Sequence, residues 1–159
     1  MYSPAATWPV KSNGRIFIAV PDRRLYVLDC SSGEEIKHFD ACARESVGIS
    51  PDGKRVYCKS MWHKIMSVDA SSLDVEWQAE TLGGYEISPT SIIQAGGEVI
   101  MPTDKGNLIG FDALTGERLW EYKIANALVN PMTIIKEGRG SWKILVCTMD
   151  GAVALLEKE

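Results

Sequence analysis

Apolar and polar residues alternate along this chain in short runs, separated by turns rich in glycine, aspartate and asparagine. One segment of twelve residues recurs four times, at 18–29, 58–69, 101–112 and 146–157, and each copy ends on an acidic residue. Each copy consists of a strand end, a polar turn and a second apolar strand, a pattern typical of antiparallel hairpins. No stretch keeps helical apolar spacing over three turns, so the pattern predicts an all-β fold.

The third copy shows the complete unit most clearly. Its predicted strands lie at 88–93, 98–102, 107–112 and 117–122, with turns at 94–97, 103–106 and 113–116. The final acids of successive copies are separated by 40, 43 and 45 residues, a period typical of solenoids and propellers. Since four consecutive antiparallel strands make a propeller blade, one domain over 1–159 is predicted. Its blades cover about 1–40, 45–80, 86–123 and 129–157, and the last lacks its fourth strand.

Residues 110–120 carry a motif of their own, Gly-Phe-Asp-Ala-Leu-Thr-Gly-Glu-Arg-Leu-Trp. It resembles the tryptophan-docking motif of the PQQ (quinoprotein alcohol dehydrogenase)-like β-propeller repeat family, Ala-x-Asp-x-x-x-Gly-x-x-x-Trp, and departs from it only at Gly110. The second copy has Leu73 at the glycine position, and the first has Lys37 at the tryptophan position. The resemblance covers nearly the whole chain and implies a ring of seven or eight blades, of which about four lie here.

Each motif residue has a physical reason to join blades. The acid can accept hydrogen bonds from turn amides, and the glycine accepts a positive φ. The indole can wedge between adjacent sheets and donate to a backbone carbonyl of the next blade. The predicted structural residues are Asp29, Gly33, Asp69, Trp77, Asp112, Thr115, Gly116 and Trp120.

Four blades complete a ring only if something closes it. The chain could be part of a longer protein, two copies could form one ring, or four blades could close on themselves. An open stack would leave one blade face uncovered at each end, which favours association.

The composition argues against several classes of protein. The chain has 159 residues, a net charge of −4, 45% apolar residues and 24% charged residues, as globular proteins do. Lysine and arginine are scattered, so we expect no nucleic-acid partner. No apolar run is long enough to span a membrane, and the first residues lack a signal-peptide pattern. The four cysteines form no C-x-x-C pair and are expected to fill apolar space, although a Cys30–Cys58 bridge stays open.

The resemblance also raises the question of PQQ chemistry. Quinoproteins of this kind carry a catalytic aspartate, a Ca²⁺ site of glutamate and asparagine, and often two adjacent cysteines over the cofactor. This chain has no Cys-Cys pair and no insert large enough for a cofactor chamber. Its histidines, His38 and His63, lack convergent acids. We therefore expect no catalytic residue, no metal site and no cofactor, PQQ included.

One candidate binding face lies in the turns between the second and third strands of the first two blades. In a propeller these turns share one face, and here they hold Arg23, Arg24, Met61, Trp62, His63 and Lys64. Aromatic residues beside arginine are typical of interaction hot spots. The alternative is that each turn simply packs on its own blade.

The sequence therefore favours a non-catalytic PQQ-like propeller scaffold that binds a protein or peptide, with a homodimer or a longer chain completing the ring. The resemblance extends to propellers of outer-membrane protein assembly, which implies an extracytoplasmic or periplasmic location. Two alternatives remain: an accessory propeller domain of a multidomain enzyme such as a hydrolase or phosphoesterase, and a fragment of a PQQ-dependent dehydrogenase.

Overall fold

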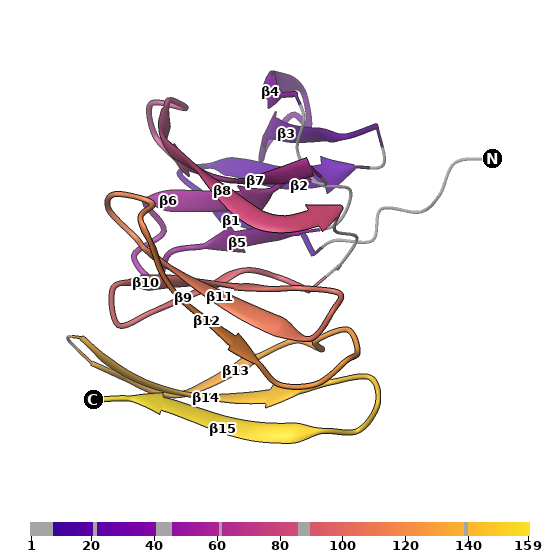
Figure 1. Cartoon of the computed structure of the whole chain (residues 1–159). Coiled ribbons are helices and arrows are strands. Elements are labelled where there is room, and N and C mark those ends of the chain that lie inside the picture. Colours follow the sequence, from indigo (N-terminus) through magenta and orange to yellow (C-terminus); the bar gives the residue numbers. More distant parts are fainter. Residues whose placement is uncertain (1–7, 21, 41–45, 61, 86–89, 139) are drawn as a thin grey trace.

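Four antiparallel sheets lie side by side in the computed structural model, which describes residues 8–20, 22–40, 46–60, 62–85, 90–138 and 140–159 (Figure 1). The described residues form strands and turns and contain no helix. The predicted all-β architecture of stacked blades is therefore confirmed.

The first two sheets contain four strands each, in chain order. The first consists of β1 (Val10–Ser12), β2 (Arg15–Val20), β3 (Arg24–Asp29) and β4 (Glu35–Phe39). The second consists of β5 (Val47–Ile49), β6 (Arg55–Lys59), β7 (Trp62–Asp69) and β8 (Val75–Tyr85).

The third sheet repeats this order, and the fourth has three strands in the described part of the chain. The third consists of β9 (Ile93–Ala95), β10 (Glu98–Pro102), β11 (Asn107–Asp112) and β12 (Arg118–Lys123). The fourth consists of β13 (Thr133–Gly138), β14 (Ser141–Cys147) and β15 (Val153–Lys158).

The third and fourth strands of each complete sheet pair in the same irregular way. Strand β11 pairs with β12, as predicted, and the register shifts between Gly110 and Phe111. The same shift occurs between Val27 and Leu28 in the first sheet and between Ser67 and Val68 in the second. Because the shift always comes just before the final acid, each third strand enters its turn in the same orientation.

The largest differences from the predicted strand boundaries are in β9 and β8. Strand β9 begins at Ile93 and includes two residues predicted as a turn, while residues 88 and 89 lie outside the described residues. Strand β8, predicted at 75–77, continues to Tyr85 because β7 extends alongside it and pairs Lys64 with Glu80 and Trp62 with Tyr85.

The core lies between the sheets, in three apolar clusters that fill the successive interfaces. Strand β10 is covered on both faces, and all five of its residues are buried. Strand β15 has one covered face, so its residues alternate between exposed and half-buried.

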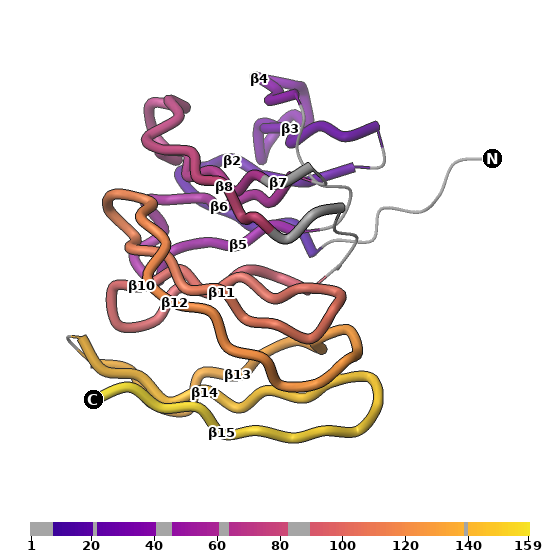
Figure 2. Tube along the Cα trace, viewed as in Figure 1, coloured from indigo at the N-terminus to yellow at the C-terminus, as the bar shows by residue number. Residues whose placement is uncertain are grey.

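The sheets follow one another in chain order along the stack (Figure 2), and the first strands of neighbouring sheets contact one another. Gly48 in β5 is essential to this approach, since a Cβ atom there would lie 2.1 Å from the Ile92 carbonyl oxygen. Any larger residue at this position would push the second and third sheets apart.

Candidate functional site

The hairpin between β2 and β3 presents Arg23 at its tip. The backbone of Arg23 adopts a left-handed conformation with a φ of 73°, which is uncommon for a residue other than glycine. Its amide donates to the Val20 carbonyl at 3.0 Å, which closes the turn. The tight turn therefore fixes where an exposed arginine leaves the blade.

Arg24 is held by its own blade. Its Nε donates to Asp40 at 2.9 Å and its Nη1 lies 3.5 Å from the Tyr26 hydroxyl. That hydroxyl in turn donates to Asp22 at 2.6 Å. The contacts with Tyr26 and then Asp40 raise the pKa of Arg24 above its usual range. The side chain stays 43% exposed, so it is an oriented cation at the surface.

The second half of the predicted binding face lies where β6 turns back into the antiparallel strand β7. The Ser60 amide donates to the Lys64 carbonyl at 2.6 Å and closes this hairpin. Met61 lies outside the described residues, whereas Trp62, His63 and Lys64 begin strand β7, and Trp62 and Lys64 also pair with β8. The side chains of Trp62 and His63 also lie outside the described part of the structure, and Lys64 is exposed. The structure thus joins Arg23 and Arg24 in one hairpin, while their grouping with the residues of β7 stays a prediction.

The acids that end the third strands bind their own turns, as predicted. Asp112 accepts hydrogen bonds from the amides of Leu114 and Thr115 at 2.9 and 2.8 Å. Asp69 does the same with Ser71 and Ser72 at 2.8 and 2.7 Å. These amide contacts lower the pKa of both carboxyl groups, and in each case the second amide of the pair has the larger effect.

Asp29 forms the same kind of turn in the first sheet. It accepts hydrogen bonds from the Ser31 hydroxyl at 2.5 Å and from the amides of Ser31 and Ser32 at 2.8 and 2.9 Å. The Ser31 hydroxyl, followed by the Ser32 amide, lowers the pKa of Asp29 to about 2.

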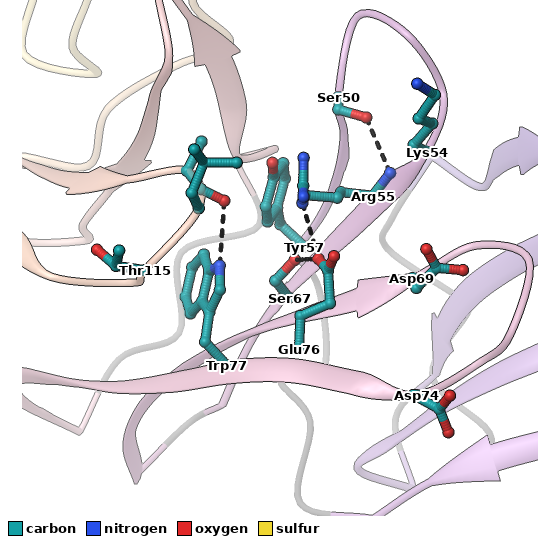
Figure 3. Close-up of polar contacts among 12 residues, drawn as sticks. Ser50, Lys54, Arg55, Tyr57, Ser67, Asp69, Asp74, Glu76, Trp77 and Thr115 are labelled. Atoms are coloured by element: carbon teal, nitrogen blue, oxygen red, sulfur yellow. Dashed lines mark hydrogen bonds and ion pairs between the residues drawn. The ribbon is translucent and has the colours of Figure 1, made fainter.

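Trp77 joins the second and third sheets as the motif predicts (Figure 3). Its Nε1 donates to the Ala113 carbonyl at 3.1 Å, and 8% of the residue is exposed. The indole rests on Gly116, where a Cβ atom would lie 2.5 Å from the Cε3 of Trp77. The glycine therefore serves both the turn and the tryptophan of the preceding blade.

Trp120 does not make the predicted bond to a carbonyl of the next blade. Its Nε1 donates to the Glu98 carboxylate of its own sheet at 2.7 Å, and its ring lies 5.8 Å from that of Trp142. Gly110 lies opposite Trp120, and a Cβ atom there would be 2.1 Å from the indole. An ionised acceptor forms a stronger bond than a carbonyl, and the missing side chain at Gly110 gives the ring room to reach it.

Two cations replace tryptophan between the first and second sheets. Lys37 donates to the Leu73 carbonyl at 2.6 Å, and Arg15 donates to the Ala70 carbonyl at 2.7 Å. Leu73 is buried at the turn position that glycine holds elsewhere, with a φ of 62°. A lysine in place of an indole leaves space for this side chain, so the two departures from the motif compensate each other.

Two other sets of polar contacts, one between sheets and one within a sheet, have no signal in the repeat pattern. The Tyr57 hydroxyl donates to Gln94 at 2.5 Å, and burial raises the pKa of this tyrosine. Glu76 accepts from Arg55 and from Ser67 at 2.8 Å each, across the second sheet (Figure 3).

Cysteine and metal chemistry can be assessed within the described residues. Cys30, Cys58 and Cys147 form no disulfide there, so the Cys30–Cys58 bridge is not present. No group of three or more histidine, cysteine, aspartate or glutamate side chains in that part is placed to hold a metal ion. The same part contains no helix that could cross a membrane.

Stacked four-stranded sheets joined by a tryptophan, a glycine and an acid define a PQQ-like β-propeller. The chain belongs to the family whose model is described as "Outer membrane protein assembly factor BamB", which matches residues 3–143.

Similar proteins agree with this assignment. The outer membrane protein assembly factor BamB of Nitrosomonas eutropha is 27% identical over 126 residues, which are 79% of this chain and 29% of that protein. The crystal structure of BamB from Moraxella catarrhalis superposes with a TM-score of 0.76 at 18% identity, over 99% of this chain and 47% of that one. Quinohemoprotein alcohol dehydrogenase from Comamonas testosteroni gives a TM-score of 0.63 at 19% identity, over 76% and 21%. This chain thus spans less than half of each relative.

Proposed function

We propose that this chain is a non-catalytic scaffold that binds a protein partner in outer-membrane protein assembly, outside the cytoplasm. The observation that carries the proposal is the rigid hairpin that presents Arg23 and Arg24 at one end of the first blade. A cation fixed before binding loses little conformational entropy when a partner docks, so it suits an interface. Membership of the family named for an outer-membrane assembly factor supports the choice of partner.

The proposed face contains Arg23, Arg24 and Lys64, with Met61, Trp62 and His63 as its predicted extension. Its cations favour an acidic partner surface, which would also increase the rate of association. The proposed scaffold needs no PQQ, because no reaction is assigned to it.

Photo-crosslinking in cells of the native host tests the proposal. A photoreactive residue at position 23 should form adducts with a component of the outer-membrane assembly machinery. The control is position 114, where a side chain that is 69% exposed lies in the turn at the other end of a blade. Equal adducts from both positions, or none with that machinery, would contradict the proposed function.

Reversing one charge tests whether the adduct depends on Arg23. With the photoreactive residue at position 64, Arg23→Glu should reduce the adduct at least several-fold. Lys54→Glu serves as the matched control, because Lys54 is equally cationic, 75% exposed and located in a turn between first and second strands. If both reversals reduce the adduct alike, the attraction is non-specific.

A further inference from the structure

Strand β8 bulges near its end, beside the start of β7. Lys64 on β7 pairs with Glu80 on β8. The next pair, Trp62 with Tyr85, comes two residues along β7 but five residues along β8. The extra residues of β8 leave the ladder, and a bulge of this kind changes the direction in which a side chain points. Leu82 lies within this bulge.

The bulge orients two neighbouring side chains against their polarity. Thr81 is 2% exposed, whereas Leu82 is 72% exposed. Burying the leucine would remove more apolar surface from water than burying the threonine does. The fold therefore loses hydrophobic stabilisation by keeping Leu82 in solvent.

The backbone of Leu82 is also strained, with a φ of 56° in the left-handed region. Among the described residues, three others that are not glycine have a positive φ. Asn13 is of a type that tolerates this conformation, and Leu73 is buried in the contact between the first and second sheets. Arg23 and Leu82 instead expose their side chains, and strain of this kind concentrates at binding sites.

The bulge lies at the same end of the stack as the arginine hairpin. Strand β8 runs parallel to β6, because both pair antiparallel with β7. It therefore ends beside the turn between β6 and β7, which is the equivalent of the β2–β3 hairpin in the first sheet (Figure 1). These two sheets are neighbours, and packed sheets lie about 10 Å apart, so Leu82 and Arg23 fit within one interface of ordinary size.

The charges at this end indicate what kind of surface could cover Leu82. Lys64 is exposed on β7, and Glu80, which is also exposed, lies opposite it and offsets its charge. Arg23 is exposed at the tip of the neighbouring hairpin, where a tight turn fixes its backbone. A complementary surface has an apolar pocket for Leu82 and a carboxylate on the side that faces Arg23.

We propose that Leu82 is the apolar anchor of the face that carries Arg23, and that it enters an apolar pocket bordered by a carboxylate on the partner protein. A side chain that is fully desolvated at the centre of an interface contributes more binding energy than exposed charges at the rim. The constrained backbone of Leu82 also limits the entropy that is lost on docking. This inference rests on the proposed scaffold function and adds the chemistry of the partner's surface.

Photo-crosslinking in cells of the native host tests the anchor. A diazirine analogue of leucine at position 82 should form an adduct with the same component of the outer-membrane assembly machinery as the photoreactive residue at position 23. Mass spectrometry of the digested adduct should locate the crosslink in an apolar segment of that component with an acidic residue beside it. The same analogue at position 114, in an exposed turn at the other end of a blade, should form no such adduct.

Substitutions at position 82 separate the side chain from its backbone. Asparagine tolerates the left-handed conformation but is polar, so Leu82→Asn should reduce the adduct formed from position 23 at least several-fold. Leu82→Met keeps an apolar side chain and should retain most of the adduct. Leu82→Gly should reduce it although the variant melts at a higher temperature, a combination that misfolding cannot produce. Leu114→Asn is the matched control and should leave the adduct unchanged, since Leu114 is equally exposed.

Three results would overturn the anchor while the adduct from position 23 still supports the scaffold function. These are no adduct from position 82, an unchanged position-23 adduct in Leu82→Asn, and a position-82 adduct that joins two copies of this chain or maps to a segment without apolar residues. If position 23 itself forms no adduct with the assembly machinery, the scaffold function is wrong, and the anchor that rests on it is wrong as well.

Discussion

At the scale of single residues, one backbone position has three different neighbourhoods. Gly33, Leu73 and Gly116 occupy equivalent places in their turns, with φ values of 75°, 62° and 74°. A Cβ atom at Gly33 would meet nothing within 4 Å, whereas one at Gly116 would collide with Trp77. All three positions require a left-handed backbone, and the side chain that each one tolerates depends on the adjacent blade.

Gly33→Ala and Gly116→Ala should therefore differ in cost. The left-handed backbone alone should destabilise Gly33→Ala by about 1 kcal/mol. Gly116→Ala should lose about 1–3 kcal/mol more, because the new methyl group displaces the indole. Urea denaturation gives both free energies of unfolding, and equal losses would show that the indole does not rest on Gly116.

Replacing Leu82 by glycine should stabilise the fold. Its φ is 56° and it is 72% exposed, so the substitution relieves backbone strain with little loss of packing. We expect about 0.5 kcal/mol of stabilisation, since the strain of about 1–2 kcal/mol is partly offset by the greater freedom of unfolded glycine.

Leu114→Gly is the matched control for that substitution. Leu114 is 69% exposed but has no positive φ, so glycine should cost about 0.5–1 kcal/mol there. Thermal melts of both variants should shift in opposite directions; a shared direction would assign the effect to leucine exposure instead of backbone strain.

The sequence predicted the residues whose partners are local. The acid of each turn and the glycine beside it act within a few positions, so the motif alone identified them. The contact of Trp77 with the next sheet was predicted as well, because its acceptor, Ala113, lies in the equivalent turn of the next repeat. Trp120 packs against the next sheet as predicted, but its predicted carbonyl acceptor is wrong. Glu98 and Gly110 become its neighbours only through strand pairing, which the linear motif does not encode.

At the scale of elements, the sequence predicted the positions of the hairpins more accurately than the lengths of their strands. It predicted the fourth strand of the second blade at 75–77, and β8 is longer because β7 continues beside it. Strand length here depends on whether a neighbour keeps pairing, so a repeat alignment could not supply it. For the same reason, Trp62 was assigned only to the turn between β6 and β7, although it also begins the part of β7 that pairs with β8.

The three acid-anchored turns should make stability depend on pH. Contacts with turn amides and hydroxyls lower the pKa values of Asp29, Asp69 and Asp112 in the folded state. These contacts stabilise the fold fully above the pKa of an unfolded aspartate, about 4. The stabilisation is lost as pH falls through the lower pKa values of the folded state. The melting temperature should therefore drop progressively between about pH 5 and pH 2.

Replacing all three acids by asparagine tests the cause. Asparagine keeps an oxygen that can accept from the turn but has no charge to titrate. The triple variant should melt somewhat lower at neutral pH and show a flatter acid limb. An acid limb as steep as that of the unchanged chain would assign the pH dependence to other carboxyl groups.

At the scale of the whole molecule, the fourth sheet leaves one face of its third strand uncovered. Val153 and Leu155 are 68% and 53% exposed on β15. Inside the stack, the equivalent strand β11 has four consecutive buried residues, from Leu108 to Phe111. The repeat count left three ways of completing the ring open, namely a longer protein, two copies or closure of four blades on themselves, and the number of blades in a complete ring stays a prediction.

The expectation that this chain binds no cofactor can be tested directly on the whole chain. PQQ is a polycarboxylate, and this chain has a net charge of −4, which opposes its approach in the absence of a bound cation. Asp29, Asp69 and Asp112, the acids that the repeat supplies, each use one carboxylate oxygen, Oδ1, to accept hydrogen bonds from turn amides. Titration of PQQ with Ca²⁺, followed by absorbance, should show no saturable change at micromolar protein. A known quinoprotein serves as the positive control, and saturable binding by this chain would reverse its assignment as a non-catalytic scaffold.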